Sequence, residues 1–113
     1  MKKISDYVRV APERIVPVIA EVIDNDVMLV YTANEFNKKQ WNWSHKYQIV
    51  DRATKILVCF ANTRKEVFEK FEECKPKYYE FQKTRQYEKL VKHVNQMIEF
   101  AKITKELETP EVE

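Results

Sequence analysis

Glycine is absent from this sequence. Glycine is the residue that lets a backbone approach a phosphate closely or adopt positive φ angles. Its absence therefore excludes a Walker-type phosphate loop, a dinucleotide-binding fingerprint and a nucleophile elbow. Tight turns must instead be built on Asn and Asp, which tolerate left-handed conformations at some cost. These exclusions remove most nucleotide-dependent enzymes, and we expect no cofactor.

Cysteines and long hydrophobic runs are also scarce. The two cysteines, Cys59 and Cys74, fit a reducing compartment better than a disulfide scaffold. No run of about 18 apolar residues occurs, so we expect no transmembrane helix. The opening stretch MKKISDYVRVAPER has two lysines but no apolar region behind them, so we expect no secretory signal. Together these features predict a cytoplasmic protein.

The composition is that of an ordinary globular chain, with 44% hydrophobic and 34% charged residues among 113. We expect one domain over residues 1–105 and an acidic, frayed tail over 106–113. The net charge is only +2, but it is unevenly distributed: residues 38–62 carry five positive and one negative group, and residues 75–92 carry six and two. Two basic segments of this kind indicate an acidic partner, and a solvated lysine-rich face is the alternative.

The first half of the chain predicts strands. Residues 1–7 are a polar lead-in, followed by a short alternating stretch in which Val8 and Val10 share a face. The β-branched run before the turn Asp24-Asn25-Asp26 predicts a hairpin with residues 27–33, and a helix over residues 12–24 is the alternative. Alternation from Gln40 to Val50 predicts a strand, and residues 55–61 predict another.

The second half predicts helices. Thr63 and Glu66 have the spacing of a capping box, and apolar residues then repeat at helical spacing as far as Cys74. Pro76 is expected in the first turn of a second helix, whose apolar stripe runs from Tyr87 to Ala101. The predicted fold class is α+β: an antiparallel β-meander of about three or four strands, followed by two C-terminal α-helices packed on the sheet.

The stretch Lys38–Gln48, KKQWNWSHKYQ, suggests a non-enzymatic nucleic-acid-binding module. Aromatic side chains on a strand flanked by basic residues are how sheet-based proteins stack bases and neutralise phosphates. The alternative is that this aromatic face fills the core, although His45 in its middle would then need a polar partner. The candidate base-stacking residues are Trp41, Trp43 and Tyr47, and His45 is a further candidate nucleic-acid-binding residue. The candidate phosphate contacts are Lys38, Lys39, Lys46, Arg52, Lys83, Arg85 and Lys89.

A protein partner is the alternative function, because aromatic residues dominate interfaces. The chain would then be an interaction factor, such as a phage or mobile-element regulator or inhibitor, binding through Tyr78, Tyr79, Phe81 and Tyr87. An uncovered edge strand could also pair two copies into a homodimer. A small ribonuclease is the third interpretation, with a site drawn from His45, Lys46, Tyr47, Tyr87 and His93. His45, Cys59, Cys74 and His93 lack metal-ligand spacing, so we expect no metal.

Overall fold

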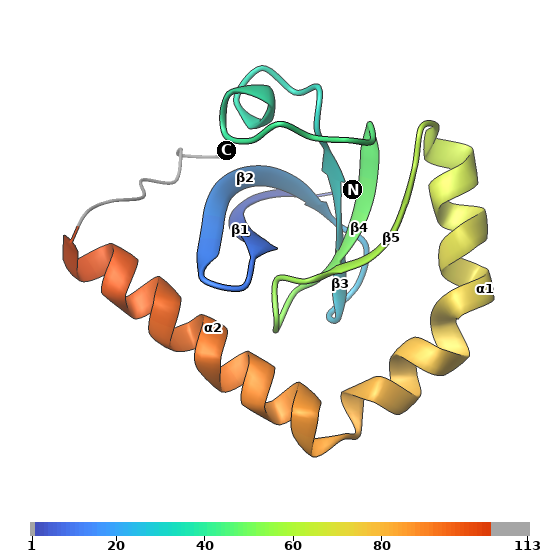
Figure 1. Ribbon diagram of the computed structural model, residues 1–113. Helices are drawn as coiled ribbons and strands as arrows, with labels where there is room; N and C mark the ends of the chain where they lie inside the picture. Colours follow the sequence, from blue (N-terminus) through green and yellow to red (C-terminus); the bar gives the residue numbers. More distant parts are fainter. Residues whose placement is uncertain (1, 105–113) are drawn as a thin grey trace.

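A computed structural model describes residues 2–104 and contains one antiparallel sheet of five strands followed by two helices (Figure 1). This confirms the predicted α+β class and the two C-terminal helices that pack on the sheet, with five strands in place of three or four. The elements are β1 (Lys3–Ala11), β2 (Arg14–Val22), β3 (Val27–Tyr31), the 3₁₀ helix η1 (Asn37–Lys39), β4 (Tyr47–Asp51), β5 (Leu57–Ala61), α1 (Arg64–Gln82) and α2 (Arg85–Thr104).

The strands follow one another in chain order, each antiparallel to the next. The predicted hairpin between β2 and β3 is confirmed, with Val22 opposite Met28, and the helical alternative for residues 12–24 is wrong. The polar lead-in is also wrong, because β1 begins at Lys3 and pairs with β2 along its length. Polar and apolar residues alternate only imperfectly in β1, but the segment still forms a strand because β2 pairs with it along its length.

The sheet is strongly curved and both of its faces are covered (Figure 1). Alternate residues of β1–β4 point into the curve and form an interior cluster of Val8, Val16, Val18, Ala20, Met28, Val30 and Val50. Their neighbours in sequence point outward. On the outer face, Leu29 and Ile49 pack against Phe71 of α1, and Tyr7 and Ile15 pack against Val94 of α2. Burial on both faces explains the continuous β-branched runs.

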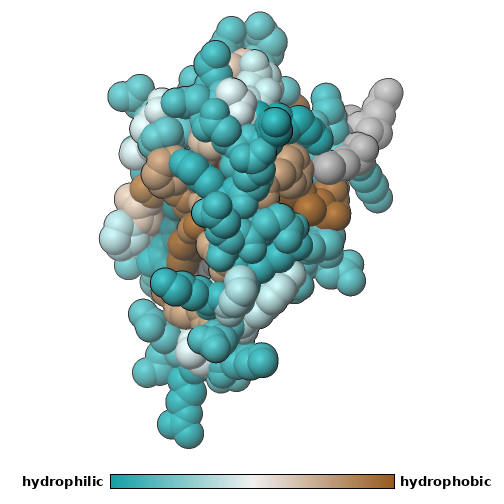
Figure 2. Space-filling view, turned by 90° about the vertical axis from the view of Figure 1, so that its right-hand side faces the viewer, coloured by the Kyte–Doolittle hydropathy of each residue, from teal (hydrophilic) through white to brown (hydrophobic). Residues whose placement is uncertain are grey.

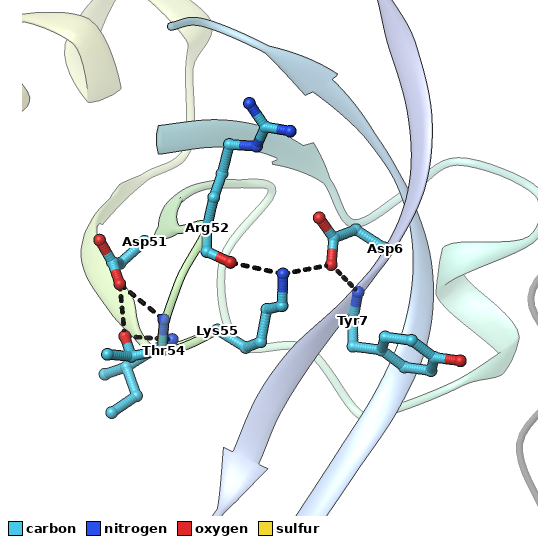
Figure 3. A network of polar contacts seen from close by, with 7 residues as sticks. Asp6, Tyr7, Asp51, Arg52, Thr54 and Lys55 are labelled. Carbon is cyan, nitrogen blue, oxygen red and sulfur yellow. Dashed lines mark hydrogen bonds and ion pairs between the residues drawn. The ribbon is translucent and has the colours of Figure 1, made fainter. Parts of the chain in front are cut away.

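The curve is closed at the β4–β5 turn, which contacts β1. The amide of Arg9 donates to the carbonyl of Lys55 at 2.7 Å, and the Lys55 ammonium lies 2.7 Å from the Asp6 carboxylate. Figure 3 shows this ammonium between Asp6 and the backbone oxygen of Arg52, to which it also donates. Among residues 2–104, Lys55 alone has a positive φ, 63°. Its contacts hold a conformation that glycine would ordinarily occupy.

Asn37 joins β2 to the segment that follows β3. Its side-chain oxygen accepts from the Ile19 amide at 2.8 Å, and its side-chain nitrogen donates to the carbonyls of Ile19 and Tyr31, both at 2.9 Å. The carboxamide thus supplies to β2 the pair of bonds that a neighbouring strand would supply. The residue is 0% exposed, so η1 is fixed to the sheet.

The predicted strand from Gln40 to Val50 is wrong for residues 40–46, because β4 begins at Tyr47. A single strand would place Trp41, Trp43 and Tyr47 on one face. Instead the two tryptophans pack against the interior cluster, whereas Tyr47 packs on the outer face with α1. The chain therefore crosses from the inside of the sheet to the outside between Trp43 and Tyr47.

The predicted helix boundary at Pro76 is also wrong, because α1 continues through Pro76 to Gln82. A proline inside a helix costs about 3 kcal/mol. Here the apolar spacing continues past it, and Tyr78, two turns beyond Phe71 and one turn beyond Cys74, is buried. The second helix begins after Thr84, whose hydroxyl accepts from the Tyr87 amide at 3.2 Å. Burial of Tyr78 outweighs the local cost of the proline.

Among residues 2–104, no helix is long and apolar enough to cross a membrane. The acidic tail predicted over residues 106–113 lies outside the described residues.

Candidate functional site

A groove lies between β1, the 40–46 segment and the start of β5. Its volume is about 250 Å³, and we call it the tryptophan groove. The residues that line it are Val8, Arg9, Val10, Trp41, Asn42, Trp43, Ser44, Gln48, Ile56 and Leu57.

The two tryptophans of this groove are half-buried, and each is held differently. The Trp43 indole donates to the backbone carbonyl of Asn37 at 2.8 Å, which fixes its orientation. The guanidinium of Arg14 lies 4.7 Å from the centre of the Trp41 ring. One part of each ring packs on the interior cluster while another part lines the groove. Each tryptophan therefore contributes to the core and also lines the groove.

Two further aromatic pairs lie beside β4. The ring centres of His45 and Phe60 are 3.9 Å apart, and the Ser44 hydroxyl lies 2.8 Å from the Nδ1 atom of His45. Tyr31 and Tyr47 stack with their ring centres 5.0 Å apart. Phe60 and Tyr31 are partly exposed, at 38% and 42%. His45 thus has a polar neighbour, Ser44, and an aromatic one, Phe60, and it is half-buried just before β4.

A second pocket, of about 260 Å³, lies between β5, the later turns of α1 and the first turn of α2. We call it the tyrosine pocket. Its lining is Asp51, Thr54, Ile56, Leu57, Val58, Cys74, Lys77, Tyr78, Phe81 and Tyr87. Figure 2 looks onto α1 and shows hydrophobic residues recessed between hydrophilic ones on this face.

The Asp51 carboxylate is the buried polar centre of this pocket, at 3% exposure. It accepts from the Thr54 amide and hydroxyl, both at 2.7 Å, as Figure 3 shows. It also accepts from the phenol of Tyr78, and the phenol of Tyr87 lies 3.0 Å from both carboxylate oxygens. Burial, together with the hydrogen bonds and negative charge of Asp51, raises the pKa of both phenols above its ordinary value.

Among residues 2–104, no group of three or more His, Cys, Asp or Glu side chains is placed to hold a metal ion. Burial, and secondarily the neighbouring thiol of Cys74, raises the pKa of Cys59 to about 12. Cys59 is therefore a poor nucleophile at neutral pH. The Nε2 atom of His93 lies 3.3 Å from the Glu13 carboxylate and Tyr87 bonds to Asp51, whereas His45 packs against Phe60.

The structure separates the predicted nucleic-acid-binding residues into two groups. Figure 1 places the segment from η1 to β4 at one end of the sheet and the α1–α2 connection at the other. Lys38, Lys39, Trp41, Trp43, His45, Lys46 and Tyr47 belong to the first end. Lys83, Arg85 and Lys89 belong to the second, and Arg52 lies on the β4–β5 turn.

The predicted partner-binding aromatics are divided as well. Tyr78 is buried, whereas Tyr79 is 38% exposed. Phe81 and Tyr87 are half-buried, meet edge to face with ring centres 5.6 Å apart, and line the tyrosine pocket.

Sequence reasoning missed three residues of these sites. Arg9 and Arg14 come to the tryptophan groove from the β1–β2 hairpin, far from the tryptophans in sequence. The sequence marks Asp51 only as a turn residue. The spacing Asp51-x-x-Thr54 is a recognisable turn signal, but nothing local indicates that two phenols from α1 and α2 also bond to it.

The fold defines a small α+β protein in which the tryptophan groove and the tyrosine pocket both include Ile56 and Leu57, at the start of β5. Comparison with protein-family models, with curated proteins and with solved structures finds no match.

Proposed function

We propose that this protein is a non-enzymatic binding module that takes single-stranded nucleic acid into the tryptophan groove. The observation that carries the proposal is the position of the Arg14 guanidinium, 4.7 Å over the Trp41 ring. A planar cation on an indole face occupies the place where a nucleobase stacks, since both are flat groups attracted to the π system. Arg14 is exposed, so its side chain is free to move from the ring to a phosphate.

The charges around the groove support the same partner. Arg9 lines the groove, and Lys46 lies in the segment that carries both tryptophans. The Arg9 guanidinium donates to the Pro12 carbonyl at 2.6 Å, which holds it at the hairpin without neutralising it. In the described part of the chain, Lys46 and Arg14 form no ion pair. Arg9 in the groove lining, Arg14 over the Trp41 ring and Lys46 three residues after Trp43 suit a partner with phosphates and bases.

The proposal predicts a steep dependence on salt. If Arg9, Arg14 and Lys46 each neutralise one phosphate, log K falls with a slope of about −2 against log salt for a single strand. The affinity should then drop about 100-fold between about 20 mM and about 200 mM salt. The titration uses a labelled mixed-sequence oligonucleotide of about twelve nucleotides, followed by anisotropy and by quenching of tryptophan emission.

The matched variants are Arg14→Gln and Lys65→Gln. Lys65 is exposed on α1, away from the groove, so its replacement changes the net charge equally. Arg14→Gln should weaken binding about fivefold and reduce the magnitude of the salt slope by about 0.7, whereas Lys65→Gln should change neither. Equal losses in the two variants, or binding that leaves tryptophan emission unchanged, would refute the proposed site. Cleavage of the oligonucleotide that is lost on His45→Ala would show a nuclease instead.

A further inference from the structure

We propose that the tyrosine pocket is a second binding site, which receives a hydrophobic side chain from an acidic segment of a partner protein. The pocket lies at the opposite end of the sheet from η1 and is lined in part by α1 and α2, neither of which lines the tryptophan groove (Figure 1). This inference does not depend on nucleic-acid binding, because the two depressions have only Ile56 and Leu57 in common among their lining residues.

The walls of the pocket indicate an apolar anchor. Phe81 and Tyr87 present a rigid edge-to-face pair on one side, and Leu57, 38% exposed, lies on the β5 side. The polar atoms at the base are fully engaged, because Asp51 accepts from Thr54, Tyr78 and Tyr87. Within residues 2–104, no buried side-chain nitrogen or oxygen lacks a hydrogen-bond partner. An anchor without its own polar group, such as Phe or Leu, therefore fits better than Tyr.

The size of the pocket indicates a side chain rather than a free small molecule. Its volume of about 260 Å³ lies below the range of about 300–1,000 Å³ in which drug-sized ligands are buried. Anchor side chains of protein interfaces enter pockets of this kind and carry much of the binding free energy.

The charges at the rim indicate the sign of the partner. Lys77 lines the pocket, Lys83 directly follows α1, and Arg85 is the first residue of α2, so the last two lie between the lining residues Phe81 and Tyr87 in sequence. These three cations form no ion pair in the described part of the chain, whereas the nearby Lys75 is paired with Glu72 at 2.6 Å. Unpaired cations around an apolar pocket attract a segment that carries Asp or Glu on both sides of its anchor.

The test uses a synthetic peptide of about ten residues, Asp and Glu with one central Phe, and a matched peptide with Ala in place of Phe. Binding is followed by amide NMR of the isotope-labelled full chain at low salt. We expect the Phe peptide to shift the amide signals of Cys74, Lys77 and Phe81, to leave the two indole signals in place, and to bind at least about tenfold more tightly than the Ala peptide.

Charge-reversal variants test the rim. Lys77→Glu should lower the affinity for the Phe peptide by about fivefold or more. Lys65 is exposed earlier on the same helix, and Lys65→Glu should leave this affinity unchanged. The inference is overturned if the Phe and Ala peptides bind equally, if neither binds at about 1 mM, or if both variants lose the same affinity. It is also overturned if the oligonucleotide used for the tryptophan groove shifts these same amides as strongly as the peptide does. Loss of nucleic-acid binding alone would leave these peptide results unchanged.

Discussion

Replacement of Asn37 by Ala should strongly destabilise the fold. The carboxamide of this fully buried residue makes three hydrogen bonds, one from the Ile19 amide and one to each carbonyl of Ile19 and Tyr31. At about 1 kcal/mol for each bond, with the buried donor and acceptors left unsatisfied, the free energy of unfolding should fall by about 3 kcal/mol. The bond from the Trp43 indole should survive, because it ends on the Asn37 backbone.

Urea unfolding, followed by tryptophan fluorescence, measures this loss. With a urea m-value of about 1.5 kcal/mol/M, a loss of about 3 kcal/mol lowers the midpoint by about 2 M. The matched control is Asn95→Ala on the exposed face of α2, which should shift the midpoint by less than about 0.3 M. A midpoint for Asn37→Ala within about 0.5 M of the wild type would refute the assigned role.

A second variant separates the hydrogen bonds from the volume of the side chain. Asn37→Asp keeps the shape and can still accept from Ile19, but a carboxylate would face the two carbonyls that now accept. Burial beside these carbonyls raises the folded-state pKa of the new carboxyl above the unfolded value of about 3.9. Its neutral form is therefore favoured in the folded state, and stability is lost as the pH rises from about 4. The loss in free energy of unfolding relative to wild type should therefore be larger at about pH 7 than at about pH 4. A loss that does not change with pH would show that only packing matters.

Two further predictions concern the β4–β5 turn and the tyrosines. Burial and Asp51 raise the pKa of Tyr78 and Tyr87 above about 10, so their contribution to stability is complete below about pH 10 and is lost as the pH rises from there through the folded-state values. Urea midpoints in alkaline buffer should therefore fall more steeply for wild type than for Tyr87→Phe, and parallel curves would contradict this. Lys55→Gly relieves about 1 kcal/mol of backbone strain at φ 63° but leaves Asp6, 12% exposed, without its cation, so we expect a net loss of about 2 kcal/mol. Thermal unfolding decides the sign, and a higher melting temperature would show that the ion pair does not stabilise the closed sheet.

The candidate sites were predictable only in part. The clustering of Trp41, Trp43 and basic residues is visible in the sequence, and it drew attention to the segment that lines the tryptophan groove. Which face of each ring is buried could not be inferred, because the segment is not a strand and crosses from the inside of the sheet to the outside. Arg14 reaches Trp41 through the β1–β2 hairpin, a contact between residues far apart in the chain.

The sequence by itself determined the elements whose signals are local. The β-branched run 14–22, the cap at Thr63 and the apolar spacing of both helices depend on neighbours within a few residues, and the strands and helices appear where these signals are. The tertiary structure alone decided the rest. Pro76 lies within α1 because a buried Tyr78 outweighs a local cost, and Lys55 adopts a glycine-like conformation because Asp6 and β1 hold it. In each case the residue adopts a conformation that its local preference disfavours. A contact that exists only in the folded chain stabilises that conformation by more than the local preference costs.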